Sequence, residues 1–466
     1  MSIVADTASV SGTIAPVTPD QRRLSGLDLA VLWGDLGVGL LVLVAGALLV
    51  PGLSLGEAML AIAIGSVIGS FLLGIAAYMG AAVGVPAMVL ARAALGLRGS
   101  YLPTTLNVLQ LLGWATFEIF VMAQVAAAVT QRAFGLELYA FWAVLFAVIC
   151  TLMALGGPVV IVRQWLKKFA VWVMIATSAW LFFFLFTAHD VPALFREPGR
   201  GGLGFWAGVD LVVALPVSWF PLVADYNRFA RRPGGSFWGT FVGYALANAV
   251  FFTLGALLVR ALGSGPFELT GALVAALGAL ALGWLALVII LVDETDEAFA
   301  NIYSTAVSLQ NAFSRIPQAA LVVAVGAVAL VLALLVSIAE YEVFLFLIGA
   351  FFVPLLGVMA ADFFVVARGR YDAAELYRRG GRHWYRGGFN LPAIAVWLAG
   401  FAAYQWLSPS PVPAWKDLLG SLFGSLGLPF PLAAELGATV PSFVLAFVAY
   451  AVIGTLVGRR RGRSER

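Results

Sequence analysis

Cysteine and histidine are almost absent from this sequence of 466 residues, which contains one cysteine, Cys150, and two histidines, His189 and His383. One cysteine excludes an internal disulfide framework and a thiolate metal cluster. Two histidines in separate loops argue against a histidine-based zinc site and against a Ser-His-Asp hydrolase. The chain also has no G-x-x-x-x-G-K-[ST] segment, and so no Walker A motif of its own. We therefore expect that the protein is not an enzyme and carries no cofactor.

Charged residues are also scarce. They make up 11% of the chain, against about 25% in soluble domains. Hydrophobic residues make up 62%, and the mean hydropathy is +0.99. Glycine, with 50 residues, outnumbers proline, with 21, as expected where helices pack closely in lipid. The composition predicts a polytopic membrane protein in contact with the lipid bilayer. The polar residues 1–27 lack the apolar core of a signal peptide, so we expect a cytoplasmic tail there.

Apolar segments long enough to cross a bilayer, about 20 residues each, occur at about twelve places. They cover residues 28–50, 55–80, 101–130, 138–158, 160–188, 203–227, 236–262, 281–312, 317–336, 342–366, 391–407 and 436–457. An even number of spans places both ends of the chain on one side of the membrane.

The basic residues support this arrangement of spans. Of the 27 lysines and arginines, 22 fall on the side of the N-terminus, and the five on the other side are Arg132, Arg196, Arg200, Arg260 and Lys416. The positive-inside rule therefore predicts that both termini are cytoplasmic, in the inner or plasma membrane of the cell. The net charge of +3 reflects the basic residues of the cytoplasmic loops, so we expect no nucleic-acid partner. We also expect no obligate protein partner.

Two spans contain residues that interrupt a helix. The first has three glycines within six residues and a carboxylate among them, in the stretch Gly34-Asp35-Leu36-Gly37-Val38-Gly39, and the sixth has two prolines in Leu215-Pro216-Val217-Ser218-Trp219-Phe220-Pro221. Both patterns weaken helical hydrogen bonding and free main-chain groups. Each alone is equally well explained by close packing or a kink. Breaks at corresponding positions of two five-span halves are, however, typical of secondary transporters built from inverted repeats.

Four carboxylates lie near the middle of the eighth span, in Asp293-Glu294-Thr295-Asp296-Glu297. A central acidic residue costs about 2.5–3.5 kcal/mol on insertion scales, so four facing lipid would cost on the order of 10 kcal/mol. An arc of about 100° on a helical wheel contains Asp293, Glu294, Glu297, Asn301, Ser304, Ser308 and Asn311, with Asp296 at one edge and Thr295 towards the back. This face must border a wet cavity or polar partners inside the protein.

Three of these acids, Asp293, Asp296 and Glu297, have i, i+3, i+4 spacing. They can converge on one cation or share protons, which predicts a role in ion coupling. The other interpretation is a structural set of carboxylates that is kept neutral by protons.

In the third span, Trp114 and Glu118 lie four residues apart and so on one helical face. A tryptophan beside a buried carboxylate suits a flat nitrogen heterocycle, because the ring stacks and the carboxylate accepts its N–H groups. Trp219, in the interrupted sixth span, is a candidate for the opposite wall. For any one of the tryptophans, core packing or anchoring at the membrane interface explains the residue equally well.

At this point the sequence resembles the nucleobase–cation symporter family, the purine–cytosine permease group, over nearly its whole length. The resemblance is carried by Gly84-Val85-Pro86-Ala87, by Arg92, Gly96 and Arg98-Gly99-Ser100-Tyr101, and by LNVLQLLGW at 106–114, SWFPLVADYNRF at 218–229 and NIYSTAVSLQN at 301–311. Within the family, the chain most resembles the branch assigned to hydroxymethylpyrimidine, a thiamin precursor.

The resemblance implies the leucine-transporter-type fold, with two inverted five-helix repeats and two additional helices. It divides the chain into the tail at 1–27, a transport core at 28–366, a basic cytoplasmic loop at 367–390, two additional helices at 391–457 and a basic tail at 458–466. It also implies stacking of the substrate on Trp114, a polar group one turn later at Glu118 and an aromatic residue near Trp219. To these three we add Ser218, Asn301, Asp35 and Gly37 as candidate substrate-binding residues.

For ion coupling, the resemblance implies a sodium site between main-chain carbonyls of the first span, near Gly34, and oxygens of the eighth span, near Asp293, Thr295, Asp296 and Glu297. Relatives commonly have Thr, Ser or Asn where this chain has acids. The departure weakens the case for sodium and strengthens the case for protons. Glu118, in place of the frequent amide, points to a substrate rich in donors, such as an aminopyrimidine or a cationic form.

These observations predict a secondary active symporter that imports a small planar heterocycle, pyrimidine-like, such as hydroxymethylpyrimidine or cytosine, with Na+ or H+ by alternating access. One alternative is a permease of the same fold for a purine, allantoin or another heterocycle. An alternative of another class is a passive cation channel lined by the acids of the eighth span. We interpret Asp225 and Arg228, at the cytoplasmic end of the sixth span, as a gate or as a helix-end contact.

Overall fold

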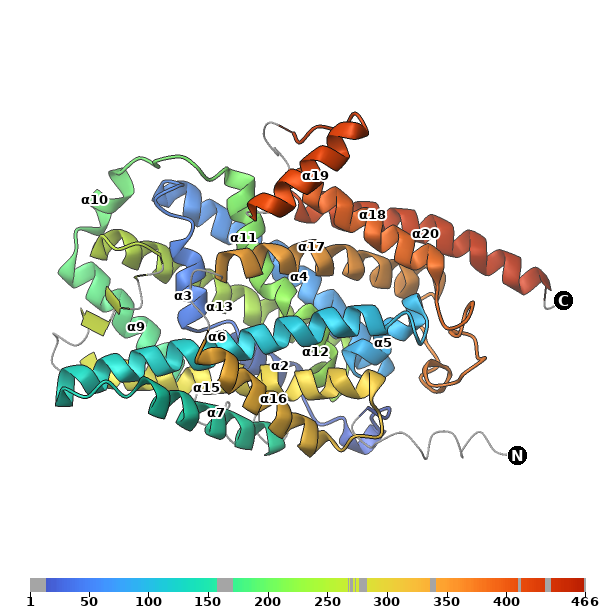
Figure 1. Cartoon of the computed structure of the whole chain (residues 1–466), viewed down its shortest axis with the longest axis horizontal. Helices are drawn as coiled ribbons and strands as arrows, with labels where there is room; N and C mark the ends of the chain where they lie inside the picture. The colour runs from blue at the N-terminus through green and yellow to red at the C-terminus, as the bar shows by residue number, and fades with distance from the viewer. Residues whose placement is uncertain are drawn as a thin grey trace.

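The computed structural model of this protein is all-helical in the part that it describes. It describes residues 14–156, 171–266, 283–335, 341–409, 412–431 and 437–464, with five isolated residues between 268 and 275. Among these residues, seven helices, or eight if one bent pair counts as a single span, are long and apolar enough to cross a membrane. Each of the twelve expected spans contains a described helix (Figure 1). The predicted polytopic fold is confirmed.

The first half of the chain forms α2 (Gly26–Asp35), α3 (Leu40–Ala47), α4 (Leu55–Val83), α5 (Ala87–Leu95), α6 (Tyr101–Phe134), α7 (Tyr139–Gly156), α9 (Val171–Ala188), α10 (Val191–Arg196), α11 (Phe205–Ser218) and α12 (Phe220–Asn227). The second half forms α13 (Pro233–Leu262), α15 (Gly283–Ala312), α16 (Gln318–Ala333), α17 (Tyr341–Ala360), α18 (Leu391–Leu407), α19 (Pro413–Ser425) and α20 (Thr439–Ser464). A π-helical turn at Ala361–Val366 continues α17, and short 3-10 turns occur at Pro19–Gln21 and Ala374–Leu376.

The ends of the helices follow local sequence signals. Ser25 and Asp28 form a capping box at the start of α2, and Ser54 and Glu57 form one at the start of α4. In each, a side chain accepts a hydrogen bond from a main-chain N–H that the helix leaves unpaired. The C-terminal end of α4 is Gly84, whose φ of 77° lies in the left-handed region that glycine adopts without strain.

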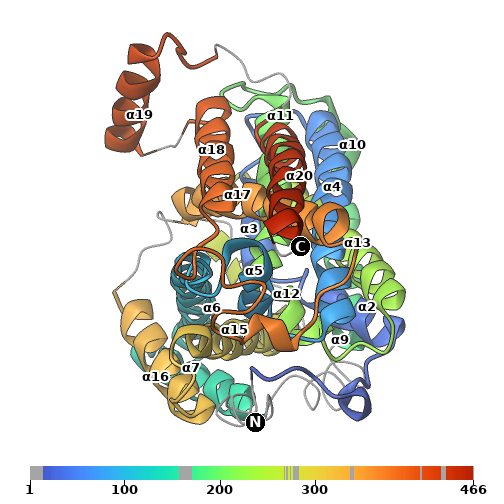
Figure 2. The ribbon, with the colours of Figure 1, turned by 90° about the vertical axis from the view of Figure 1, so that its right-hand side faces the viewer.

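Two groups of helices meet at the centre of the protein. Group A consists of α2, α3, α4, α11, α12 and α13, and group B consists of α6, α7, α15 and α16; within each group the helices pack on one another. Figure 2 shows α6, α7, α15 and α16 together at one side, with α4, α11, α17, α18 and α20 towards the other. The groups meet where α3 packs on α6 and α12 packs on α15, and side chains of α6 donate hydrogen bonds to the main chain of the sixth span. A movement of one group against the other would have to break these hydrogen bonds.

The predicted interruption of the first span is confirmed. Helix α2 ends at Asp35, α3 begins at Leu40, and the two are bent by 63°. The sixth span differs, because Trp219 alone separates α11 from α12, and residues 205–227 form one span without a comparable bend.

Side chains of α6 stabilise the sixth span near its prolines. The Gln110 side-chain amide donates to the main-chain oxygen of Ser218 (2.8 Å), and that of Asn107 donates to the main-chain oxygen of Pro221 (3.2 Å). These amides satisfy carbonyls at the interruption, as a break inside a membrane requires.

Glycines on α13 allow α2 and α3 to approach it closely. A Cβ atom at Gly243 would lie 2.3 Å from the main-chain oxygen of Ala30, and one at Gly255 would lie 2.0 Å from that of Leu43. We expect Gly243→Ala to destabilise the protein by about 1–3 kcal/mol, because a rigid main-chain atom occupies the space of the new methyl group. The measurement is the melting temperature of the purified protein.

Gly234→Ala, in the first turn of the same helix, is the matched control, because no heavy atom lies within 4 Å of its Cβ position. Equal melting temperatures for the two variants would contradict the close approach of α2 to α13.

The described part of the predicted N-terminal tail packs on the protein. Ile14 and Leu24 are buried, and the Arg22 guanidinium donates to the main-chain oxygen of Ala81 near the end of α4 (2.6 Å). The main-chain N–H of Leu24 donates to Phe229, just after α12 (3.0 Å). This segment, the 367–390 loop and the end of α20 lie at the same end of the molecule, on the right in Figure 1.

Candidate functional site

A narrow cavity lies where groups A and B meet. Group A contributes Leu36, Leu41, Val42, Leu215, Trp219 and Tyr244, and group B contributes Trp114, Glu118 and Glu297. All nine residues are buried. The cavity has a volume of about 10 Å³, which is room for about one water molecule. It is therefore closed to a ring, which can bind only when the walls move apart.

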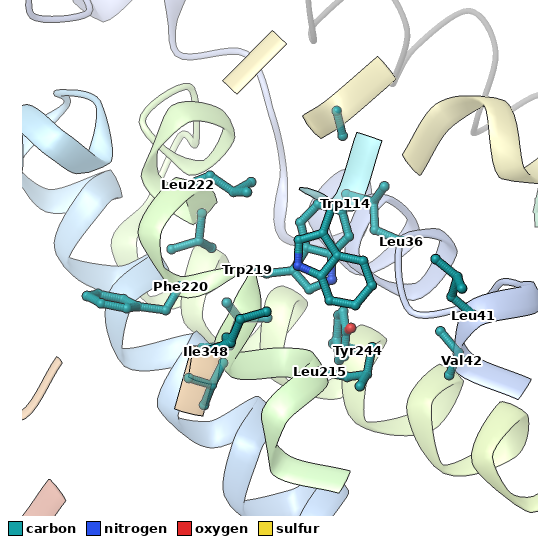
Figure 3. Close-up of a cluster of buried hydrophobic side chains, with 14 of the residues drawn as sticks. Leu36, Leu41, Val42, Trp114, Leu215, Trp219, Phe220, Leu222, Tyr244 and Ile348 are labelled. Carbon is teal, nitrogen blue, oxygen red and sulfur yellow. The ribbon is translucent and has the colours of Figure 1, made fainter. Parts of the chain in front are cut away.

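Aromatic side chains form much of the wall. Figure 3 shows Trp114 and Trp219 beside Tyr244, with Leu36, Leu41 and Val42 around them. The Trp114 ring packs against Phe344 of α17 at a centroid distance of 5.2 Å. The structure thus brings together Trp114, Glu118 and Trp219, as the sequence analysis predicts.

Trp219 is held in turn by Trp33 of α2, whose ring lies edge-on to it at 5.8 Å. The Trp33 indole N–H donates to the Asn227 side-chain oxygen (2.7 Å), and the Asn227 amide donates to Ser236 (2.7 Å) and Thr240 (2.9 Å) of α13. This buried network joins the ends of α2 and α12 to α13.

Three carboxyl groups meet beside the aromatic wall. Glu118 of α6 and Glu294 and Glu297 of α15 each offer an oxygen atom within 4.8 Å of the other two, and all three are buried. We call this set the carboxylate triad. Its oxygens are close enough to share protons or to hold one cation.

The break in the first span faces this triad. The main-chain N–H of Leu40, the first residue of α3, donates to Glu294. A Cβ atom at Gly39 would lie 2.8 Å from an oxygen of Glu294 and 3.0 Å from one of Glu297. A side chain at this position would displace the two carboxyl groups, so the break and the acids fit one another.

Asp296 points to a different neighbour. Its carboxyl group is buried within hydrogen-bonding reach of Asp35, the last residue of α2. Two adjacent buried carboxyl groups require a shared proton or a cation between them. The Thr295 hydroxyl donates back to the main-chain oxygen of Val292 (2.7 Å). The side chain of Asp293 lies outside the described residues.

The other predicted site residues lie outside the cavity wall. Gly34 and Gly37 face Gly243 and Ala247 of α13, so any contact that they make with a ligand is through the main chain. Ser218 donates to the main-chain oxygen of Leu215 (2.6 Å).

Asn301 is buried one helical turn beyond Glu297, and its side-chain amide makes no hydrogen bond with a described residue. The polar stripe that continues along α15 does face inward as predicted. Ser308 accepts a hydrogen bond from Asn107 (2.8 Å), and Asn311 donates to Thr104 (2.8 Å).

Asp225 and Arg228 join α12 to two other helices. Asp225 accepts a hydrogen bond from the main-chain N–H of Ala87 at the start of α5 (3.0 Å). Arg228 reaches the Tyr303 hydroxyl of α15 (3.4 Å) and the main-chain oxygen of Asp225 (3.2 Å). These contacts close the end of the molecule that carries the N-terminal segment, which fits a helix-end contact and also a gate.

Several residues of the cavity and of the carboxylate triad beside it were not predicted as site residues from the sequence. Glu294 had a detectable signal, because it shares a helical face with Glu297. Gly39, which adjoins the triad, had a weaker signal as the last of three closely spaced glycines. Leu36, Leu41, Val42, Leu215 and Tyr244 are apolar or aromatic residues in apolar spans, and no pattern distinguishes them from ordinary packing residues.

An interrupted span whose break faces a closed cavity between two helix groups is the arrangement of a secondary membrane transporter. The sequence matches over residues 16–453 a family described as permeases for cytosine/purines, uracil, thiamine and allantoin. The chain belongs to this family, so it is a multi-pass membrane permease and not an enzyme.

Individual relatives support this assignment. The hydantoin permease of Microbacterium maritypicum is 25% identical over 451 residues, covering 92% of this chain and 90% of the relative. The purine-uracil permease NCS1 of Arabidopsis thaliana is 24% identical, covering 98% and 79% of the two chains. The solved structure of Mhp1, a nucleobase-cation-symport-1 family transporter in a closed conformation with bromovinylhydantoin bound, superposes with a TM-score of 0.79 at 20% identity, covering 98% and 96%. The leucine-transporter-type fold is thereby confirmed.

Proposed function

We propose that this permease is a secondary active symporter that imports a small, planar, pyrimidine-like heterocycle together with Na+ or H+. The observation that carries the proposal is the buried cavity that Trp114, Trp219 and the acidic side chain of Glu118 line together. Aromatic faces bind a flat ring, and a carboxylate accepts hydrogen bonds from ring N–H groups. Hydroxymethylpyrimidine and cytosine have this shape and these donors.

The coupling ion would bind where the first span is interrupted. Asp35 and Asp296 adjoin each other there, and Glu297 belongs both to the carboxylate triad and to the cavity wall. Uptake of a cation or protons relieves repulsion between these acids and favours a closed arrangement of α2, α3 and α15. The acidic side chains favour protons over sodium, because a monovalent ion balances only one carboxylate.

Transport would then follow alternating access, with group A moving against group B around the cavity. The distribution of the basic residues favours cytoplasmic termini. Contacts of Asp225, Arg228 and the N-terminal segment would accordingly form the inner closure.

Thermal-shift measurements on the purified protein test the proposal, with a panel of pyrimidines, purines, hydantoin and allantoin and with sodium and pH varied independently. We expect a pyrimidine-type ring to raise the melting temperature in a manner that depends on one ion. A purine or allantoin as the strongest ligand would support the alternative cargo, which the names of the relatives also favour. If no ring stabilises the protein under any condition, the proposal is wrong.

A further inference from the structure

We propose that an anionic phospholipid binds where the end of the 367–390 loop meets the start of α6, with its phosphate held by Arg98 and Arg386. The inference goes beyond the proposed function, because it depends neither on the transported ring nor on the coupling ion. It is carried by two segments that are fastened together and that present exposed arginines beside exposed apolar residues.

The loop carries an excess of positive charge. Residues 367–390 contain six arginines and two acidic residues. One of these acids, Glu375, is already paired with Arg378 of the same loop, with 3.0 Å between the charged atoms. Arg98 and Arg386 are both exposed, and neither forms an ion pair with a carboxylate of a described residue. Their charges are therefore available to an anionic ligand.

Main-chain hydrogen bonds fix the end of the loop on the connection between α5 and α6. The main-chain N–H groups of Arg98 and Gly99 both donate to the carbonyl oxygen of Gly388, at 2.9 Å and 3.0 Å. The main-chain N–H of Asn390 donates to the carbonyl oxygen of Leu95 at the end of α5 (2.8 Å). In Figure 2 the loop crosses in front of α5, between α6 and α18. A ligand that bridges the two arginines would meet a main chain that is already in place, which lowers the entropic cost of binding.

A tryptophan of the loop directs the Arg98 side chain. The guanidinium carbon of Arg98 lies 5.3 Å from the centre of the Trp384 ring. The same guanidinium donates to the carbonyl oxygen of Gly387 (3.4 Å), the residue that follows Arg386. Tryptophan is enriched at the level of the lipid headgroups, because its ring is apolar and its N–H is polar. These contacts orient Arg98 towards the segment that carries Arg386.

The residues that flank this charged surface are apolar and exposed. Phe389 and Leu391, at the start of α18, are 39% and 57% exposed, and Leu102 in the first turn of α6 is 46% exposed. In a membrane permease such side chains contact acyl chains. The basic residues predict that this end of the protein faces the cytoplasm, where the membrane leaflet contains anionic lipids.

A phospholipid matches both parts of this surface. Guanidinium groups bind phosphate oxygens through paired, charge-assisted hydrogen bonds, and the acyl chains would cover the flanking apolar residues. A free phosphate would satisfy the arginines but would leave Leu102, Phe389 and Leu391 uncovered.

The test measures the melting temperature of the full-length purified protein in dodecyl maltoside micelles to which a ligand is added. The first probe is dioleoylphosphatidylglycerol, which is anionic. The second is dioleoylphosphatidylcholine, which has the same acyl chains and no net charge. The third is sn-glycerol 3-phosphate, which has the phosphate and no acyl chains. We expect phosphatidylglycerol alone to raise the melting temperature, with a dependence on its concentration that saturates.

The double variant Arg98→Gln/Arg386→Gln is expected to need at least about tenfold more phosphatidylglycerol for half of the maximal stabilisation. Arg386→Gln alone serves if the double variant does not fold, because the Arg386 side chain makes no hydrogen bond or ion pair with a described residue. We expect a shift of about fivefold for this single variant. The matched control is Arg231→Gln/Arg232→Gln, which removes two exposed arginines between α12 and α13 and should respond like the unmodified protein.

Several outcomes would overturn the inference. Equal stabilisation by phosphatidylcholine would show that the charge plays no part, and stabilisation by glycerol phosphate at the same concentration would indicate a site for a soluble phosphate. An equal shift in the double variant and in the matched control would show attraction to overall charge instead of to Arg98 and Arg386. The inference is also wrong if phosphatidylglycerol has no effect on the unmodified protein.

Discussion

Replacing Trp114 by alanine is expected to abolish measurable ring binding. Stacking of a base on an aromatic side chain contributes about 1–3 kcal/mol by alanine substitution, and the loss of the indole also removes one wall of the cavity. Because 1.4 kcal/mol corresponds to a tenfold change in affinity, we expect an affinity loss of about 100-fold or more. The measurement is calorimetric titration of the ring that stabilises the unmodified protein best.

Two companion variants separate stacking from general damage. Trp114→Phe keeps an aromatic face and should retain part of the affinity. Trp238→Ala removes a tryptophan of α13 that is 61% exposed, and it should bind the ring like the unmodified protein. The melting temperature of Trp114→Ala without ligand shows how much stability its contact with Phe344 supplied. Unchanged affinity in Trp114→Ala would refute the stacking role.

Changing Asp296 to asparagine is expected to remove or strongly weaken the dependence of uptake on sodium or pH. Asparagine has nearly the same shape, but it leaves Asp35 without an acidic neighbour, so the pair no longer requires a shared proton or a cation. Concentrative uptake should fall most, because it depends on the ion gradient, while exchange of ring for ring should be less affected. The measurement is uptake into proteoliposomes with the sodium and pH gradients imposed separately.

Asp210→Asn is the control for the loss of a buried carboxyl group. Asp210 lies in α11 and accepts hydrogen bonds from the main-chain N–H groups of Ala438 and Thr439 at the start of α20. Asp210 is not among the residues that line the cavity, so the ion dependence of Asp210→Asn should match that of the unmodified protein. If both dependences survive in Asp296→Asn, in Asp293→Asn and in Glu297→Gln, the assignment of coupling to the eighth span is wrong.

The parts of the fold that sequence could predict are those with a strong local signal. The three glycines near Asp35 predict the break in the first span, and the structure has it between Asp35 and Leu40. The helical wheel of the eighth span predicts an inward polar face, and Glu294, Asn301 and Asn311 are buried there. Such local signals are sufficient to predict these features because a polar group inside a bilayer must find its hydrogen-bonding partners within the protein.

The arrangement of the acids could not be predicted, because it depends on contacts between helices far apart in sequence. Spacing along α15 grouped Asp293, Asp296 and Glu297, whereas the described carboxyl groups that meet are Glu118, Glu294 and Glu297, with Asp296 beside Asp35. Pro216 and Pro221 predicted a larger break than the structure has. Side-chain amides of α6 donate hydrogen bonds to main-chain oxygens at the interruption, and the sequence of the sixth span alone does not reveal these donors. The same spacing of acids along one helix is compatible with several different pairings with residues of other helices.

The link between Trp33 and Asn227 has a consequence for how the permease conducts its cycle. It fastens the half-helices α2 and α12 to each other and to α13, so neither can swing away without breaking buried hydrogen bonds. In the symport proposed above, the ends of α2 and α12 would accordingly move together with α13. Joint movement of this kind would disfavour a partial opening through which an ion or a ring could escape alone.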